Sequence, residues 1–259
     1  MIEILLLIAN ILSPPAQRPL IALTFDDGAC TPPGARVVKI LDEHKVKATF
    51  FPKWKAVRKN FRCMNASLWM ATNYGPNEYG IHGWEQGDIN NIIQCNSPTE
   101  IVIPADFLHQ FAPTKYPKGA HVFYRPSSGI KMTSKTRTWI GQIWDIHMPN
   151  HPFPIEVTWT FDTRDIDMWN KGVPGIEAIP KLKHTMTKLF YTRDNHIVLM
   201  HDNLSWTPKV LKWFLGDRRT KRVEFVTMSE FAGRVIVRLV LKELGDICRR
   251  IVDEGKRFT

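Results

Sequence analysis

A short apolar run, a helical segment and a second apolar run near the start of the chain limit most strongly how it can fold. Residues 20–25 have the composition of a buried strand, and residues 34–44 place their apolar side chains on one face of a helix. Residues 48–51 then have the composition of a second strand. A strand, a helix and a strand in this order indicate a βαβ unit, so we predict an α/β fold with a parallel sheet.

The alternation of strands and helices continues along the chain. Strands are predicted at residues 121–124, 156–161, 197–200 and 224–226, and helices near residues 134–144 and 176–190. This pattern is compatible with an open sheet and with a barrel.

The C-terminal residues 230–253 have the spacing of a long amphipathic helix. We expect this helix to dock on the domain, with a helix lying on a membrane surface as the alternative. Its apolar stripe consists of Val237, Leu241, Leu244, Cys248 and Ile251.

Composition favours one large domain. The chain has 259 residues, of which 44% are hydrophobic, and a formal net charge of +10. The basic residues form short clusters without a nucleic-acid motif, so we interpret them as solvated faces and expect no nucleic-acid partner. A basic rim could instead attract an anionic glycan. The clusters are Lys53, Lys55, Arg58, Lys59 and Arg62; Arg218, Arg219, Lys221 and Arg222; and Arg249 and Arg250.

The first 16 residues resemble a short secretory signal. Residues 4–12 are apolar apart from Asn10, and Ser-Pro-Pro-Ala follows at residues 13–16. The stretch is too short to span a bilayer, so we expect no stable membrane insertion and a secreted or cell-wall protein. A buried first strand is the alternative, because a basic n-region is missing and Glu3 lies near the start.

Cysteine usage is compatible with export. Four cysteines allow three disulfide connectivities, and none has the close spacing of a structural zinc site. We favour Cys30 with Cys248 and Cys63 with Cys95; four buried thiols are expected if the chain is not exported. Two sequons, at Asn65 and Asn203, would be glycan acceptors in a eukaryotic secretory pathway.

Two adjacent carboxylates close the first apolar run. Asp26 and Asp27 are followed at once by Gly28, within the segment T-F-D-D-G. Successive side chains of a strand point to opposite faces, but a sharp turn at Gly28 would bring both carboxylates to one pocket. Two carboxylates in one pocket favour different duties, one as a metal ligand and one as a base. A turn with solvated acids is the alternative.

Five segments resemble the motifs of the polysaccharide deacetylase family, the NodB-homology carbohydrate esterases. They are T-F-D-D-G and residues 77–92, 124–129, 159–165 and 197–202, in the family's order and spacing. The resemblance covers roughly residues 18–233 and implies a distorted (β/α) barrel over residues 17–233, with residues 234–259 as an added helix. In such barrels the site lies at the carboxyl ends of the strands.

The second motif departs most from the family. Members carry two histidines four residues apart, which hold a divalent metal together with the second Asp of the first motif. Here residues 82–86 are H-G-W-E-Q, so the resemblance implies a Zn²⁺ or other divalent metal site at Asp27, His82 and Gln86. A glutamine oxygen is a weaker zinc ligand than imidazole. If this turn is helical, Glu85 would lie on nearly the same face as Gln86 and could serve in its place.

The remaining motifs imply the catalytic groups. Arg125 would orient the base Asp26 through a bidentate bond and lower its pKa. Asp165 would hold His201, which would be the general acid. The expected substrate-binding residues are Leu199, Ser128 and Trp84.

Three functions remain open. The first is a metal-dependent N-deacetylase that releases acetate from an N-acetylglucosamine polymer, chitin-like or, as the rival substrate, peptidoglycan. The second is a catalytically inactive relative that binds a glycan or a partner, and the third acts on another amide or a lipid-linked sugar. Replacing Gln86 with histidine should raise metal affinity and activity if the first is correct.

Overall fold

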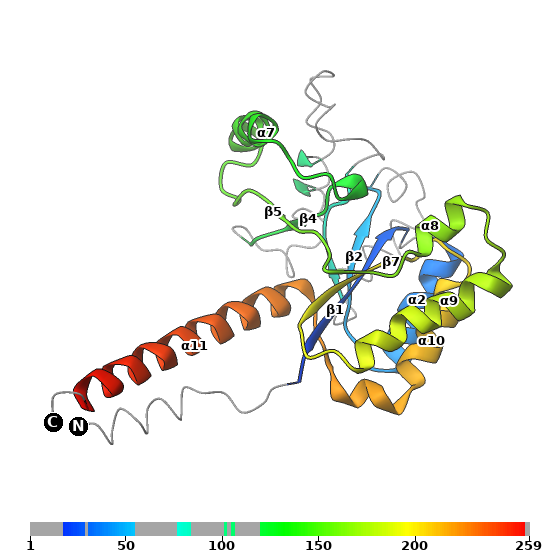
Figure 1. The fold of residues 1–259 in the computed structure, drawn as a ribbon. Coiled ribbons are helices and arrows are strands. Elements are labelled where there is room, and N and C mark those ends of the chain that lie inside the picture. Colours follow the sequence, from blue (N-terminus) through cyan, green and yellow to red (C-terminus); the bar gives the residue numbers. More distant parts are fainter. Residues whose placement is uncertain are drawn as a thin grey trace.

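The structure is a computed structural model that describes residues 18–28, 31–54, 77–83, 101–102, 105–106 and 120–256. Strands alternate with helices around a parallel sheet (Figure 1), as predicted. Several predictions fall outside the described residues: the signal at residues 1–16, the residues Trp84, Glu85 and Gln86, the sequon at Asn65, and the disulfide partners Cys30, Cys63 and Cys95.

The central strand of the sheet is β1. It pairs in parallel with β2 on one side and with β7 on the other, and the strand order is β3-β2-β1-β7-β6. β8 pairs with the first two residues of β1. The bounds are β1 Leu20–Asp27, β2 Thr49–Pro52, β3 Glu78–Tyr79, β6 Phe161–Asp162, β7 His196–His201 and β8 Glu224–Phe225.

Two further short strands form a second parallel sheet that continues the distorted (β/α) barrel. β4 (Phe123–Tyr124) pairs with β5 (Ile155–Glu156), and a bridge between Ile81 and Tyr124 connects β4 to the segment after β3. The chain then passes from β5 to β6, which pairs with β7. The single strand predicted at residues 156–161 is therefore wrong, because its two ends pair with different neighbours.

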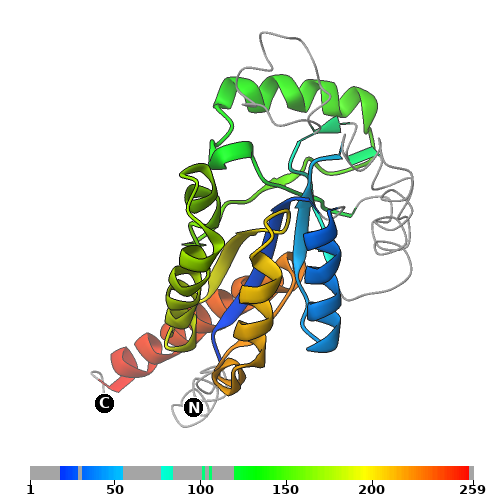
Figure 2. The same ribbon diagram turned by 90° about the vertical axis from the view of Figure 1, so that its right-hand side faces the viewer.

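Helices cover the outer face of the sheet. In Figure 2, α2, α10 and α9 lie along β1, β2 and β7. The first of them begins at Pro32, two residues before the predicted start: Thr31 Oγ1 accepts a hydrogen bond from Gly34 N, and two prolines occupy the first turn. The helices are α2 Pro32–Glu43, α7 Ser134–His147, α8 Asp165–Asn170, α9 Gly175–Thr187 and α10 Thr207–Gly216, with 3-10 turns at Ser127–Gly129, Lys188–Phe190 and Arg218–Arg222.

Alternation along β1 separates two apolar clusters. Ile21, Leu23 and Phe25 pack with the helices, whereas Leu20 and Ala22 belong to a smaller cluster on the barrel side. Because side chains alternate in a strand, Thr24 and Asp26 share the barrel face with Leu20 and Ala22. The first carboxylate is thereby aimed into the barrel.

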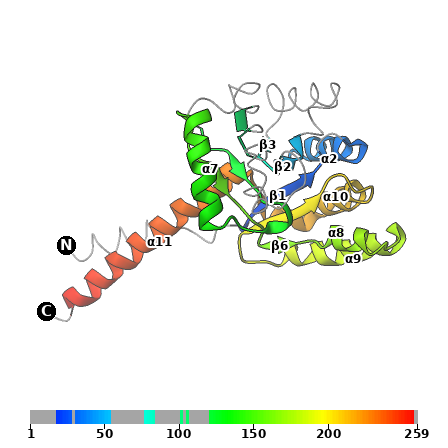
Figure 3. The same cartoon turned by 90° about the horizontal axis from the view of Figure 1, so that it is seen from above.

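The long C-terminal helix α11 (Met228–Lys256) contacts the barrel through its first turns. Phe231 and Val235 pack against the barrel-side cluster, and Arg238 donates a hydrogen bond to Asn195. Beyond this the helix extends away from the barrel (Figures 1 and 3). Val237 and Leu244 of the predicted docking stripe are 55% and 44% exposed.

Within residues 234–256, Arg234, Val235 and Arg238 contact the barrel, whereas Leu239 and Leu244 further along are exposed, so the described helix departs from the docking expected along its whole length. The helix itself is confirmed. None of the described helices combines the length and the apolar character needed to cross a membrane.

Candidate functional site

The two adjacent carboxylates converge at the carboxyl end of β1. Asp26 points into the barrel, and Asp27 has a φ of 82°, in the left-handed region. This backbone conformation interrupts the strand alternation, so both side chains reach the same histidine. His82 Nε2 lies 3.7 Å from Asp26 Oδ2 and 3.6 Å from Asp27 Oδ1.

Asp27, and not Gly28, adopts the left-handed conformation. Gly28 is instead required by close packing. The turn predicted at Gly28 is thus wrong in its mechanism. A Cβ at Gly28 would lie 2.9 Å from Asn203 Cβ and 3.0 Å from Thr31 Cγ2. Its N–H also donates to Asp202 Oδ1 at 2.8 Å, so only a residue without a side chain fits here.

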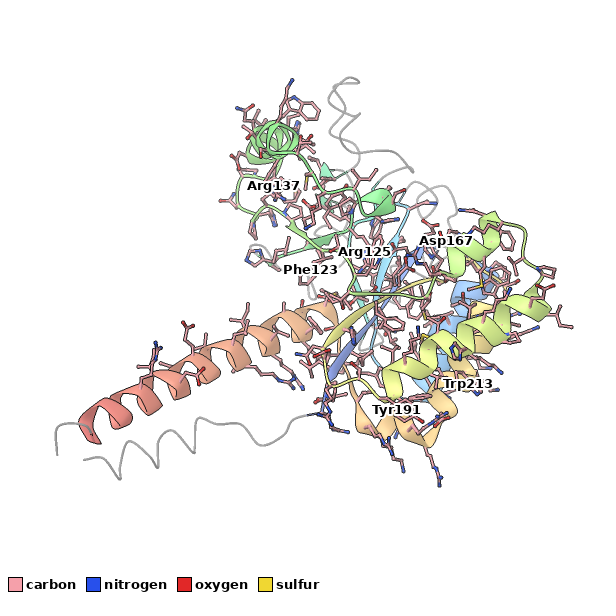
Figure 4. All side chains as sticks on the ribbon, viewed as in Figure 1. Phe123, Arg125, Arg137, Asp167, Tyr191 and Trp213 are labelled. Carbon is pink, nitrogen blue, oxygen red and sulfur yellow. The ribbon has the colours of Figure 1, made fainter. Side chains whose placement is uncertain are left out.

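Arg125, which is labelled in Figure 4, directly follows β4 and contacts Asp26. Its guanidinium is fully buried, and Nη1 donates to Asp26 Oδ1 at 2.8 Å and to Thr24 Oγ1 at 2.7 Å. The predicted bidentate bond is wrong, because one nitrogen makes both contacts. Burial alone would raise the pKa of Asp26, but Arg125, His82 and His201 together hold it below its ordinary value.

Aromatic rings cover the rest of this guanidinium. The ring centroids of Phe51 and Trp159 lie 4.3 Å and 5.9 Å from Arg125 Cζ. Trp159 also packs on Gly129, where a Cβ would meet its ring at 2.5 Å. Within the described part of the chain, Arg125 Nε and Nη2 have no hydrogen-bond partner.

His201 ends β7 and is held by Asp165 at the start of α8. Asp165 Oδ1 lies 2.9 Å from His201 Nδ1, and Oδ2 accepts the His201 backbone N–H at 2.7 Å. Burial lowers the pKa of His201, but the bond to Asp165, with the charges of Asp26 and Asp27, raises it to about 9. The imidazole is therefore protonated at neutral pH.

His82 is oriented by a main-chain carbonyl group. Its Nδ1 lies 2.9 Å from the carbonyl oxygen of Arg125. A carbonyl oxygen only accepts, so Nδ1 carries the hydrogen, and in the neutral ring the Nε2 lone pair faces Asp26 and Asp27.

The donor atoms present fit two ligands of a divalent metal. The 3.6 Å between His82 Nε2 and Asp27 Oδ1 is too long for a hydrogen bond. It is close to the roughly 3.3 Å that separates two ligands of a tetrahedral zinc ion with bonds of about 2.0 Å. Across the residues that the structure describes, no set of three or more His, Cys, Asp or Glu side chains forms a metal-holding group.

Lys53 is a site residue that the sequence did not reveal. Its Nζ lies 2.9 Å from Asp27 Oδ1, and its side chain is 21% exposed. The interpretation of its cluster as a solvated face is therefore wrong for this lysine. One signal was available: Lys53 directly follows β2, and residues that follow parallel strands gather at the same edge as Asp27.

Asp202 is a second charged residue of the site, fully buried beside Gly28. Its Oδ1 accepts the Gly28 N–H, while Oδ2 has no partner among the described atoms. Burial, with smaller contributions from Asp27 and Asp26, raises the pKa of Asp202 to about 8. Asn203 follows, and its Nδ2, where the sequon would carry a glycan, lies 3.4 Å from Asp27 Oδ2.

Of the predicted substrate-binding residues that the structure describes, one is buried and one is exposed. Leu199 is buried on β7, two residues before His201, and so shares its barrel-facing side. Ser128 is exposed, with a φ of 57° in the 3-10 turn after Arg125. The half-buried ring of Trp159, which opens the fourth motif but was not among the expected substrate-binding residues, lies beside that turn.

Sequence comparison relates the chain to deacetylases. Residues 13–126 match the family model described as polysaccharide deacetylase. Peptidoglycan-N-acetylglucosamine deacetylase PgdA of Listeria monocytogenes is 26% identical over 213 residues, which are 82% of this chain and 39% of the relative. The chain therefore spans about two fifths of the length of this curated relative.

Solved structures show the same fold. Peptidoglycan deacetylase PdaC from Bacillus subtilis superimposes with a TM-score of 0.61 at 17% identity, over 94% of this chain and 98% of the other. BA3943 from Bacillus anthracis, described as a CE4 family pseudoenzyme, superimposes with a TM-score of 0.57 at 18% identity. That match covers 83% of this chain and 66% of the other.

Proposed function

The protein belongs to the polysaccharide deacetylase family, and from that premise we propose that it removes acetyl groups from N-acetylglucosamine units of a polysaccharide. One observation carries the proposal. Asp26 and His201 lie at the same end of the barrel, and their surroundings shift their pKa values in opposite directions, lowering that of Asp26 and raising that of His201. Such a separation is typical of a base and an acid that work together.

Each group has a role in amide hydrolysis. Asp26, kept ionised by Arg125, accepts a proton from the attacking water. His201, kept protonated by Asp165, donates a proton to the amine that leaves. A divalent metal held by Asp27 and His82, with Gln86 or Glu85 completing the set, would polarise the amide carbonyl and lower the pKa of a bound water.

The substrate we propose is a polymer of N-acetylglucosamine outside the cell or in its wall. Relatives in sequence and fold are described as peptidoglycan deacetylases, and a chitin-like polymer carries the same acetamide group. The half-buried ring of Trp159 supplies apolar surface beside Arg125, which contacts Asp26. Both polymers therefore belong in the same assay.

The experiment is acetate release from chitin oligomers and from peptidoglycan, with and without a chelator. Asp26→Asn and His201→Ala should each lower the rate by at least about 100-fold, because each removes one proton transfer. Asp194→Asn and His184→Ala are matched controls, since both residues are exposed and lie away from the site. A rate unchanged in Asp26→Asn would contradict the proposal.

A second candidate is glycan binding without turnover. Lys53 favours it, because an ammonium group already contacts the carboxylate that would hold the metal. The fold neighbour BA3943 is itself described as a pseudoenzyme. Binding of chitin oligomers that survives both chelator and Asp26→Asn, with no acetate released, would support this candidate. Loss of binding under both conditions would exclude it.

A further inference from the structure

Lys53 brings a cation of the chain itself to the carboxylate that would hold the metal. We infer that this ammonium group competes with a divalent metal for Asp27 and thereby sets the metal affinity of the site. The inference rests on the proposed function for the identity of the site, and it adds a residue that regulates metal occupancy.

The ammonium group of Lys53 and the imidazole of His82 both lie near the same oxygen atom, Asp27 Oδ1. Lys53 Nζ lies 2.9 Å from Asp27 Oδ1, and His82 Nε2 lies 3.6 Å from the same atom. The side chain of Asp27 is only 8% exposed, so its attraction to a nearby cation is stronger than at an open surface. A metal at this oxygen must displace the ammonium group or accept its repulsion.

The backbone holds Lys53 in this position. Asp27 and Pro52 are register partners in the pairing of β1 with β2, and Lys53 N donates to Asp27 O at 3.4 Å. The next residue, Trp54, is buried and donates from its backbone to Gly83 O and from its ring to Gly80 O. Lys53 therefore lies between two fixed residues.

Charge balance points the same way. Within the described residues, each ionised carboxylate of the site has its own cation: Arg125 for Asp26, Lys53 for Asp27, and His201 for Asp165. Each pair is in contact at 2.9 Å or less. A divalent ion would bring this set from a net charge of zero to +2, or to +1 if Lys53 moves away.

The size of the effect follows from the population of the pair. An apparent dissociation constant rises as the fraction of molecules with a free ligand falls. If the ammonium group occupies Asp27 in nine molecules of ten, metal affinity falls about tenfold. Removing the charge should therefore raise zinc affinity by at least about tenfold.

The test is zinc titration of the metal-free full chain against a chromogenic chelator. Lys53→Met and Lys53→Gln should each bind zinc at least about tenfold more tightly than wild type, and two such variants guard against a folding defect in one. Lys53→Arg keeps the charge and should remain weak. Lys47→Met is the matched control, because Lys47 lies before the same strand and pairs with Glu230 at 2.6 Å, away from the site.

The outcomes separate this inference from the proposed function. Unchanged or weaker zinc binding in both neutral variants would overturn the inference, as would an equal gain in Lys47→Met or no zinc binding by any protein. Acetate release is measured in parallel. Tighter zinc binding by the neutral variants without acetate release would support the inference and refute the proposed activity. Acetate release with zinc affinity unchanged by the Lys53 substitutions would support the proposed activity and refute the inference.

Discussion

Gly28 is the position at which one added carbon atom should most disturb the site. An alanine Cβ there would press on Asn203 and Thr31 at 2.9 Å and 3.0 Å. Both neighbours must move, so we expect Gly28→Ala to lower the free energy of unfolding by about 1–3 kcal/mol, the usual cost of overpacking. Urea denaturation followed by circular dichroism measures the change.

Gly141 provides the control for this substitution. It lies inside α7, and a Cβ at that position would meet nothing within 4 Å. Gly141→Ala should therefore raise the free energy of unfolding by about 0.5–1 kcal/mol, because alanine is the better helix former. Equal stability of the two variants would mean that Gly28 is not closely packed.

Asp27 shows how one backbone angle shapes the site. Strand alternation would point it away from Asp26, yet its φ of 82° returns its carboxylate to the same side. Aspartate enters the left-handed region more readily than most residues with a side chain. The pair of carboxylates in one pocket was predictable, whereas the residue that reverses the chain was not.

At the scale of elements, α11 divides into an anchored start and an exposed remainder. Thr227 N donates to Glu230 Oε2 and Glu230 N donates to Thr227 Oγ1, as in a capping box. Buried Glu78 accepts the backbone N–H and the hydroxyl of Ser229. The start of the helix is thus tied to the end of the sheet by polar contacts and by Phe231.

This division predicts two different effects on stability. A chain ending at Arg238 should lose less than about 1 kcal/mol of unfolding free energy, because the side chains removed, such as Leu239 and Val240, are already more than half exposed. Phe231→Ala should cost about 2–4 kcal/mol, since its ring packs on the barrel-side cluster. Guanidinium denaturation measures both. A larger loss from the truncation would show that the distal helix does pack on the barrel.

At the scale of the whole molecule, two buried groups make the free energy of unfolding decrease as pH rises. His201 and Asp202 have folded-state pKa values raised to about 9 and about 8 from ordinary values of 6.5 and 3.8. A raised pKa contributes stability that is fully present below the ordinary value and is lost as pH rises through the folded value. Asp26, with a lowered pKa, contributes in the opposite sense, and its contribution is lost in acid.

We therefore expect stability to fall as pH rises from 3.8 to about 8 through Asp202, and from 6.5 to about 9 through His201. Each group contributes a slope of up to about 1.4 kcal/mol per pH unit while the folded state holds the extra proton. Denaturation midpoints across this range measure the slope. Asp202→Asn keeps the acceptor for Gly28 N–H and should flatten the curve. A profile identical to wild type would mean that Asp202 does not titrate there.

The sequence by itself determined the order of the elements and most of the groups at the mouth of the barrel. Asp26, His82, Arg125, Asp165 and His201 are brought together as expected. The physical reason is that the carboxyl ends of parallel strands meet at one edge, so residues that follow successive strands become neighbours. The resemblance to the family's motifs singled out these residues, and the predicted strands placed them at one edge of the sheet.

Only the tertiary structure decided the features that depend on contacts between residues distant in the sequence. Whether a lysine is solvated or paired depends on the residues that surround it. Lys53 pairs with Asp27 because the strands β2 and β1 that precede them are neighbours in the sheet. The segment at residues 156–161 changes partners: its first residue pairs with β4 and its last with β7. Likewise, helical spacing predicts an apolar stripe on α11 but not whether a surface is present to cover it.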